Sequence, residues 1–357
     1  MIFISRNVIV ISLLFSLSYA DHNTSSTYES NYIDDTHHEL SHTVMEWSDI
    51  VDTKLSTWLE DDEANATQQV ESASELPKET LEEEVNYVDS FFQTGKYLDE
   101  TDNTYILLRT ESFFQSKESA DFGLKLRAQM PFRKSKKNLR IFIEDVTSDN
   151  AGNVLQDKDE SPSIGLNYYR PETYGINSKY SIGFSGIDPY VRARYNKPFK
   201  TDNWYIDVAQ IFQYSTDDKF EEETNLYFDR QFEDMSLLRL QLHRATHQEI
   251  DGMDYGMSIQ YYFSQKKDNT GLRLSQTFFG NTEYPYVVNN NVEPPLTKTY
   301  GGVHTYTSTL TWRRNVWRKW FYFEVRPAVS FQKMYDWDPN YSIRIFLDFY
   351  FGKFDKI

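Results

Sequence analysis

Apolar and polar residues alternate along the C-terminal two-thirds of this chain, from about residue 104 onward. The last segment shows the pattern most clearly, because every second residue from Tyr341 to Phe351 is apolar, with Ser342, Arg344 and Asp348 between them. Successive side chains of a β-strand point to opposite faces, so a period of two predicts strands with one apolar and one polar face. The region is therefore predicted to be all-β.

Fourteen such segments can be delimited. They are residues 104–115, 119–131, 138–146, 162–170, 177–186, 188–198, 203–214, 219–232, 235–247, 253–265, 270–280, 302–314, 318–333 and 341–352. Most have about the length that crosses a bilayer when a strand is tilted, and single-chain bacterial barrels have an even number of strands. We therefore expect an antiparallel transmembrane β-barrel of about 14 strands, with roughly 12 to 16 as the range.

The composition agrees with a barrel and disfavours other classes. The mean hydropathy is −0.65, yet 16% of the residues are aromatic, including 26 Tyr and 25 Phe. A barrel combines these properties because its lumen face is polar while aromatic girdles lie at both membrane interfaces. After residue 20 no apolar run is long enough for a spanning helix. The chain has no cysteine, which excludes disulfides, thiol catalysis, cysteine-bound metals and a lipoprotein anchor.

The lengths of the connections predict an orientation. If the first strand starts in the periplasm, the long connections 147–161 and 281–301 both fall outside the cell. Short turns then fall inside, as in known barrels. These turns are at 132–137, 199–202, 233–234, 266–269 and 315–317, and one inside connection, 171–176, is longer than typical. Loop 281–301 is long enough to be expected to fold inward as a constriction or to bind a surface partner.

The first twenty residues have the features of a secretory signal peptide. Arg6 precedes an apolar stretch at 8–17, and Ser18 to Ala20 resemble a cleavage site. Export to the cell outer membrane is the expected localisation. A retained membrane anchor is the alternative, which the short apolar run disfavours.

Residues 21–103 form a separate acidic segment, expected to be partly disordered and partly helical, which either lies in the periplasm or plugs the barrel. They hold 22 Asp and Glu against 3 Lys, close to −19, whereas the whole chain is −17. The region 104–357 is thus nearly neutral, and nucleic-acid binding has no support. Residues 21–35 are expected to be a disordered leader and 60–80 a linker or frayed helix. Between them, an apolar stripe predicts a helix over 44–59. This helix is expected either to pack on its own small domain or the barrel mouth, or to bind a periplasmic partner or plug the barrel. Its candidate partner residues are Trp47, Val51, Leu55 and Trp58.

Charged residues on the polar face of the predicted strands are expected to line the lumen. They are Glu111, Lys125, Arg127, Arg140, Glu144, Arg192, Arg194, Asp207, Glu223, Asp229, Arg239, Arg273, Glu324, Arg326, Arg344 and Asp348. They predict either a polar pore whose charges set ion preference or a closed barrel filled by ion pairs. Fourteen strands enclose more space than wall side chains usually fill, which favours an open or loop-constricted lumen. Nine basic against seven acidic residues do not predict anion selectivity.

Two pairs of residues that include histidine have the side-chain types of a metal or catalytic site. His243 and His247 share a face, but about 13 Å of strand separates their Cα atoms, so shared metal ligation is not expected. His304 and Ser308 also share a face, but they are too far apart for a base and its nucleophile. The acidic stretches 145–160 and 217–223 show no metal-binding spacing and are expected to be solvated loops. No cofactor, metal site or catalytic residue is predicted.

The signal peptide, the alternating strands of spanning length, the aromatic content and the aromatic last strand resemble Gram-negative outer-membrane β-barrels in general. The resemblance covers residues 104–357. Tyr341, Phe349 and Phe351 resemble the assembly signal of that family, although residues 352–357 follow in place of a terminal Phe. It implies contact with outer-membrane lipids and with the barrel-assembly machinery. We expect a passive channel for small polar solutes or ions. The alternatives are an envelope barrel that anchors a binding or assembly function through its acidic segment, and a barrel hydrolase.

Overall fold

The computed structural model describes residues 32–60, 80–92, 94, 103–132, 138–144, 162–201, 203–233, 236–248, 251–265, 269–289 and 296–352. The predicted signal peptide, the linker at 60–80 apart from its ends, and the loop 147–161 lie outside these residues. Two α-helices are described, α2 (Tyr32–Glu60) and α3 (Thr80–Phe92). Helix α2 begins at Tyr32, so the last residues of the expected disordered leader are helical.

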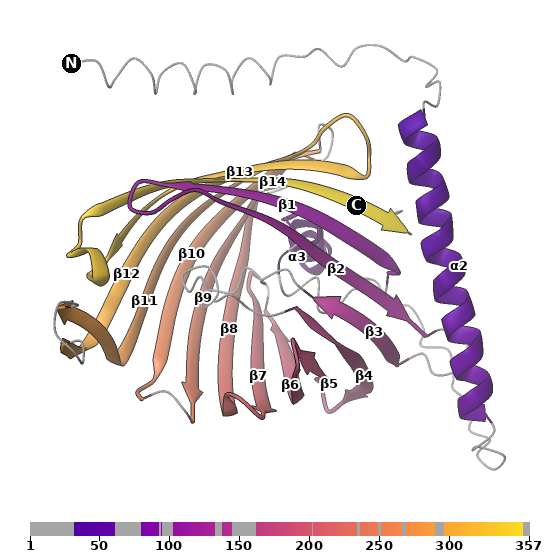
Figure 1. The fold of residues 1–357 in the computed structure, drawn as a ribbon, viewed down its shortest axis with the longest axis horizontal. Coiled ribbons are helices and arrows are strands. Elements are labelled where there is room, and N and C mark those ends of the chain that lie inside the picture. The colour runs from indigo at the N-terminus through magenta and orange to yellow at the C-terminus, as the bar shows by residue number, and fades with distance from the viewer. Residues whose placement is uncertain are drawn as a thin grey trace. The chain divides into compact units, whose positions relative to one another are not determined.

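Within the described residues, fourteen strands form one closed antiparallel barrel, as the alternation predicts. The strands are β1 (Tyr105–Gln115), β2 (Asp121–Pro131), β3 (Leu139–Glu144), β4 (Ser163–Thr173), β5 (Ile176–Ser185), β6 (Asp188–Lys200), β7 (Tyr205–Ser215), β8 (Lys219–Glu233), β9 (Ser236–His247), β10 (Asp254–Gln265), β11 (Thr270–Asn289), β12 (Leu296–Asn315), β13 (Phe321–Gln332) and β14 (Pro339–Gly352). Each strand pairs with its neighbours in sequence (Figure 1).

Strands β1 and β14 close the barrel. They pair over the full length of β1, from Tyr105 opposite Gly352 to Gln115 opposite Ser342. Closure satisfies the backbone groups that an open sheet edge would leave unpaired, which a membrane-spanning sheet requires. We call the end where β1 begins and β14 ends the near end, and the opposite end the far end.

The near end has tight turns. Strands β4 and β5 are joined by Tyr174 and Gly175, whose φ angles of 56° and 71° match the two-residue hairpin turn that follows the twist of the strands. The expectation of a longer connection at 171–176 is therefore wrong, because β4 extends to Thr173. The β3–β4 and β11–β12 connections both fall at the far end, as the predicted orientation requires.

The expectation of a loop over 281–301 is wrong for most of that range. Strands β11 and β12 continue as a long hairpin, in which Tyr284 lies opposite Tyr300 and Pro285 opposite Thr299. Register shifts after Phe279, Asn281 and Val287 interrupt the ladder. Each bulge leaves an extra residue unpaired and bends the strand, after which the pairing of β11 with β12 resumes.

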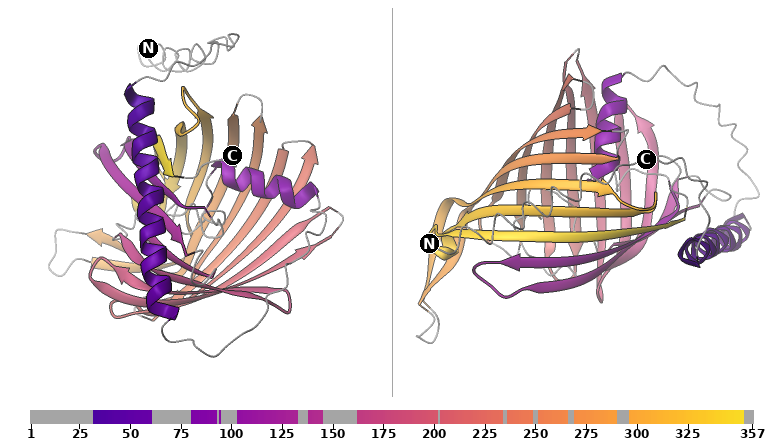
Figure 2. Two further views of the ribbon diagram at one scale, coloured as in Figure 1. Left: turned by 90° about the vertical axis from the view of Figure 1, so that its right-hand side faces the viewer. Right: turned by 90° about the horizontal axis from the view of Figure 1, so that it is seen from above.

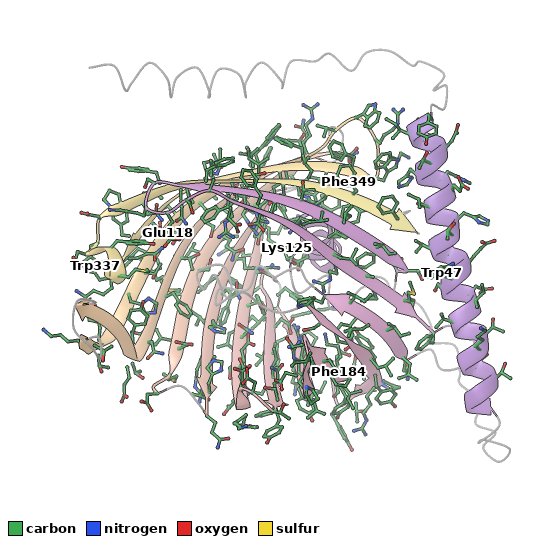
Figure 3. The ribbon with its side chains drawn as sticks, viewed as in Figure 1. Trp47, Glu118, Lys125, Phe184, Trp337 and Phe349 are labelled. Atoms are coloured by element: carbon green, nitrogen blue, oxygen red, sulfur yellow. The ribbon has the colours of Figure 1, made fainter. Side chains whose placement is uncertain are left out.

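The outer face of the barrel is apolar and aromatic. On β2, Phe122 and Leu124 are 68% and 64% exposed. Rings from consecutive strands touch along one row of the outer wall, in the order Tyr168, Tyr180, Tyr195, Phe212 and Phe220. Phe184 and Phe349 add further aromatic side chains from β5 and β14 (Figure 3). Such a surface is suited to lipid and its interfaces.

Candidate functional site

Helix α3 is packed inside the near end of the barrel (Figure 2). Val85, Val88, Phe91 and Phe92 are each 1% exposed and belong to one apolar cluster. The barrel wall contributes inward-facing side chains to this cluster: Tyr105, Leu107, Tyr205, Leu237, Tyr262, Tyr322 and Tyr350. Each α3 side chain buried in this way stabilises the docked helix by about 1.5–3 kcal/mol before the cost of ordering.

Contacts of α3 run along the wall from β8 to β13. Phe92 meets Tyr262 of β10 edge to face at 5.2 Å, and Phe91 meets Tyr322 of β13 at 6.3 Å. Gly271 of β11 makes room for both rings, because a Cβ atom there would lie 2.6 Å from Phe91 and 2.7 Å from Phe92. The wall is therefore shaped to receive the helix.

One buried cation ties α3 to the wall. Arg239 of β9 donates to both carboxylate oxygens of Asp89 on α3, at 2.7 and 3.1 Å, and to both oxygens of Asp229 on β8, at 2.6 and 2.9 Å. The three side chains are at most 3% exposed. Elsewhere on α3, partial burial raises the pKa of the Tyr87 phenol. Because one guanidinium serves two carboxylates, Asp89 can be removed without leaving Arg239 and Asp229 unpaired.

A second buried network joins β1, β12, β13 and β14. Asp348 accepts a bidentate pair from Arg109 at 2.7 and 2.8 Å and a further hydrogen bond from Arg313 at 2.7 Å. Arg313 also donates to Glu324 at 2.9 Å and to the Tyr350 hydroxyl at 3.1 Å. Side chains from both sides of the β1–β14 junction are thus held together inside the lumen.

All sixteen charged residues predicted to line the lumen are placed on the inner face of the wall. Several are brought together in ion pairs: Arg127 with Glu144 at 2.8 Å, Lys125 with Glu111 at 3.0 Å, Arg344 with Glu111 at 3.5 Å, and Arg326 with Glu324. Arg192 and Arg194 of β6 donate to Gln213 and Asn196. Lys125 and Glu118 are shown on β2 and on the far-end turn before it in Figure 3.

Sequence reasoning missed Arg109, Lys179 and Arg313. Arg109 and Lys179 occupy the inward parity of their strands and could have been found by the same alternation as Glu111. Arg313 follows Trp312 and precedes Arg314, so two adjacent arginines compete for one inward position. The structure buries Arg313 to 1% exposure, where it bridges two carboxylates.

The structure places the two histidine pairs differently. His243 and His247 face inward, and His243 contacts Asn225 at 3.0 Å. No group of three metal-binding side chains occurs among the described residues. His304 is the extra residue of a bulge between Val303 and Thr305, so it is buried inward while Ser308 faces outward. The prediction that these two share a face is therefore wrong.

Of the four candidate partner residues on helix α2, the structure describes the side chains of two. Trp47 is 65% exposed and Val51 is half-buried. The side chains of Leu55 and Trp58 lie outside the described part of the chain.

Two polar cavities lie along the inner wall. One of about 280 Å³ is lined by β10–β14 and β1 towards the far end, with Ser, Thr, Asn and Gln side chains alongside Arg273, Arg326 and Arg344. The other, of about 380 Å³, lies at the near end of β4–β6 and includes Lys179, Arg194 and Asn196. Polar and charged side chains thus line both cavities.

A closed antiparallel barrel with an apolar outer face and a charged inner face defines this chain as a protein of the outer-membrane β-barrel class. Among the described residues, no helix has the length and apolar character to cross a bilayer.

No protein-family model and no curated protein matches the sequence. Similar solved structures include the outer-membrane expressed OmpT of Vibrio cholerae, at TM-score 0.43 and 10% identity over 70% of this chain and 97% of that chain. An anion-selective porin from Comamonas acidovorans is similar at TM-score 0.42 and 10% identity, over 70% and 98%. A KdgM porin has TM-score 0.34 and 7% identity, over 68% and 98%. At such identities the similarity concerns the fold alone.

Proposed function

We propose that the protein is an outer-membrane channel for small polar solutes, narrowed at its near end by α3. The supporting observation is the asymmetry of the lumen: α3 packs against strands from β8 to β13, while the wall at β4–β6 carries a polar cavity of about 380 Å³. In a ring of fourteen strands β4 lies seven places from β11, so these two strands are on opposite sides of the lumen. Solutes would pass between the two.

Export by the N-terminal segment 1–20 and a periplasmic near end are part of this proposal. The near end carries the tight turns and the far end the long β11–β12 hairpin, which is the usual asymmetry of such barrels. Solute passage needs no catalytic step, and His304 and Ser308 lie on opposite faces of the wall.

The second candidate is a barrel that conducts nothing and anchors a periplasmic function. The Asp89–Arg239 contact favours it, because a charged and buried attachment holds α3 firmly within the wall. Residues 21–103 would then present a partner-binding surface, with Trp47 as one exposed element.

Planar-bilayer recordings of the purified full chain test the channel. We expect discrete conductance in the wild type and a larger one in Asp89→Asn, in which α3 is held less tightly. The outcome that overturns the channel is the lack of conductance above background in both proteins, provided that both migrate as folded barrels in unheated gels.

A further inference from the structure

Four basic residues occupy outward-facing strand positions at the near end of the barrel. They are Arg170 of β4, Lys197 of β6, Arg230 of β8 and Arg314 of β12. Each is among the last five residues of its strand, and all four strands run towards the near end. Tyr168, Phe199 and Phe232, each two positions from one of them, are 41%, 44% and 54% exposed, as side chains on the outer face are. We call these four cations the near-end belt.

The charge of the near-end belt is not balanced within the described part of the chain. None of its four cations has an acidic partner among the described residues. Glu172 is exposed beside the β4–β5 turn and pairs with none of them. The far end differs, because the outward-facing Arg244 of β9 pairs with Glu222 of β8 at 3.3 Å. The belt therefore presents positive charge to whatever surrounds the near end of the barrel.

Aromatic rings hold two of the belt cations against the outer wall. The Arg230 guanidinium lies 5.4 Å from the ring centroid of Trp204 and 5.3 Å from that of Phe232. The Lys197 ammonium lies 5.4 Å from the ring centroid of Phe199. A guanidinium that packs by its face keeps its N–H donors at the edge, where they can bind a phosphate with two hydrogen bonds. Aromatic rings of this kind mark the membrane interface, so these cations are expected at the depth of the lipid headgroups.

The other two belt cations have neutral neighbours. The Nε of Arg314 is buried and has no hydrogen-bond partner among the described residues. Its register partner on β13 is Phe323, whose side chain offers no acceptor. Arg170 interacts with the Tyr180 hydroxyl, which carries no charge to oppose its own. Since buried donors are normally satisfied, Arg314 in particular calls for an acceptor from outside the wall.

We propose that the near-end belt binds the phosphate headgroups of anionic glycerophospholipids, such as phosphatidylglycerol, in the leaflet that surrounds the near end. A phosphate supplies both the negative charge and the acceptor oxygens that these cations lack within the described chain. A lipid is the source that fits, because the four side chains project from the apolar, lipid-facing wall rather than into the lumen. Outward cations are tolerated at an interface and are attracted there by anionic lipid. The proposal goes beyond the channel and does not depend on conduction. It rests on the proposed function only for the identification of this leaflet as the periplasmic one.

Native mass spectrometry of the full chain in detergent, titrated with phosphatidylglycerol, tests the proposal. We expect the wild type to bind this lipid at least fivefold more tightly than phosphatidylcholine, whose phosphate is balanced by a choline. Lys197→Gln and Arg230→Gln should each weaken the binding of phosphatidylglycerol about fivefold, as expected for removing one basic residue at a lipid surface. The double variant should be weaker than either.

Arg244→Gln is the matched control, because it also removes an outward-facing cation, but one whose charge Glu222 already pairs. It should bind phosphatidylglycerol as the wild type does. All variants are compared as folded barrels, identified by their migration in unheated gels. Equal affinity of the wild type and the double variant for phosphatidylglycerol overturns the proposal. So does displacement of the lipid by inorganic phosphate at the same concentration, or tighter binding of lipopolysaccharide than of phosphatidylglycerol.

Discussion

Asp89 on α3 and Arg239 on β9 are 150 residues apart in sequence and form a bidentate ion pair inside the barrel, with N···O distances of 2.7 and 3.1 Å. Arg239 keeps its bidentate pair with Asp229 whether or not Asp89 is present. The docking of α3 and the integrity of the wall are therefore separable by mutation.

Replacing Asp89 by Asn should loosen α3 without unfolding the barrel. Losing the charge-assisted contact should weaken docking by about 1–3 kcal/mol. Since the chain has no cysteine, a single Ser90→Cys substitution reports the opening of α3 through its rate of maleimide labelling. We expect that rate to rise about tenfold or more when Asp89→Asn is added. Tyr174→Cys, at a site 93% exposed, should label equally fast in both backgrounds.

Replacing Arg239 by Gln should be far more damaging than replacing Asp89. It leaves Asp89 and Asp229 facing each other in a buried site, at a cost of about 3–5 kcal/mol. Urea unfolding in detergent should show this loss in Arg239→Gln and a much smaller one in Asp89→Asn. Equal stability of the two variants would contradict the role of Arg239 as the shared cation.

Replacing Gly271 by Ala should displace α3 by contact alone, with no change of charge. The new Cβ would lie within 2.7 Å of both Phe91 and Phe92. Gly123 on β2 is the control, because a Cβ there would have its nearest neighbour, Glu111, at 3.9 Å. Gly271→Ala should raise both Ser90→Cys labelling and conductance, whereas Gly123→Ala should match the wild type in both.

Replacing Asp348 by Asn should destabilise the barrel where it closes. Arg109 and Arg313 would lose their common carboxylate at a site that is 0% exposed, which costs about 3–5 kcal/mol. Asp338→Asn removes an exposed pair with Lys117 at the far end and should cost at most about 1 kcal/mol. Unfolding followed by tryptophan fluorescence measures both, and similar losses would argue against a structural role for the network.

The barrel could be predicted from sequence because each strand carries its own signal. Alternation is a local property, and it located even the short strand β3 (Leu139–Glu144). Alternation did not predict the structure at positions where the period of two is interrupted. The bulge at His304 reverses the face on which the residues before it lie. Tyr174 adopts a positive φ in a tight turn, although tyrosine is not a residue type that predicts such a turn.

The lumen could be predicted only in part, because its organisation depends on partners far apart in the chain. The parity of the strands identifies Arg239 as inward-facing, but nothing near it in sequence indicates Asp89 as its partner. The opposition of Lys179 and Arg194 requires the register of β5 and β6, which a list of charges does not contain.

The pairing of β1 with β14 also has a consequence for the order of assembly. All other neighbouring strands are hairpins and can form from local chain segments, whereas Arg109 and Asp348 are 239 residues apart. Closing so long a loop costs more conformational entropy than forming a hairpin, so we expect the β1–β14 pairing to form last. Helix α3 precedes β1 in the chain and contacts strands from β8 to β13, so docking of α3 would hold the start of β1 near the strands that β14 follows. The helix that narrows the finished lumen would thus also serve as a template for closing it.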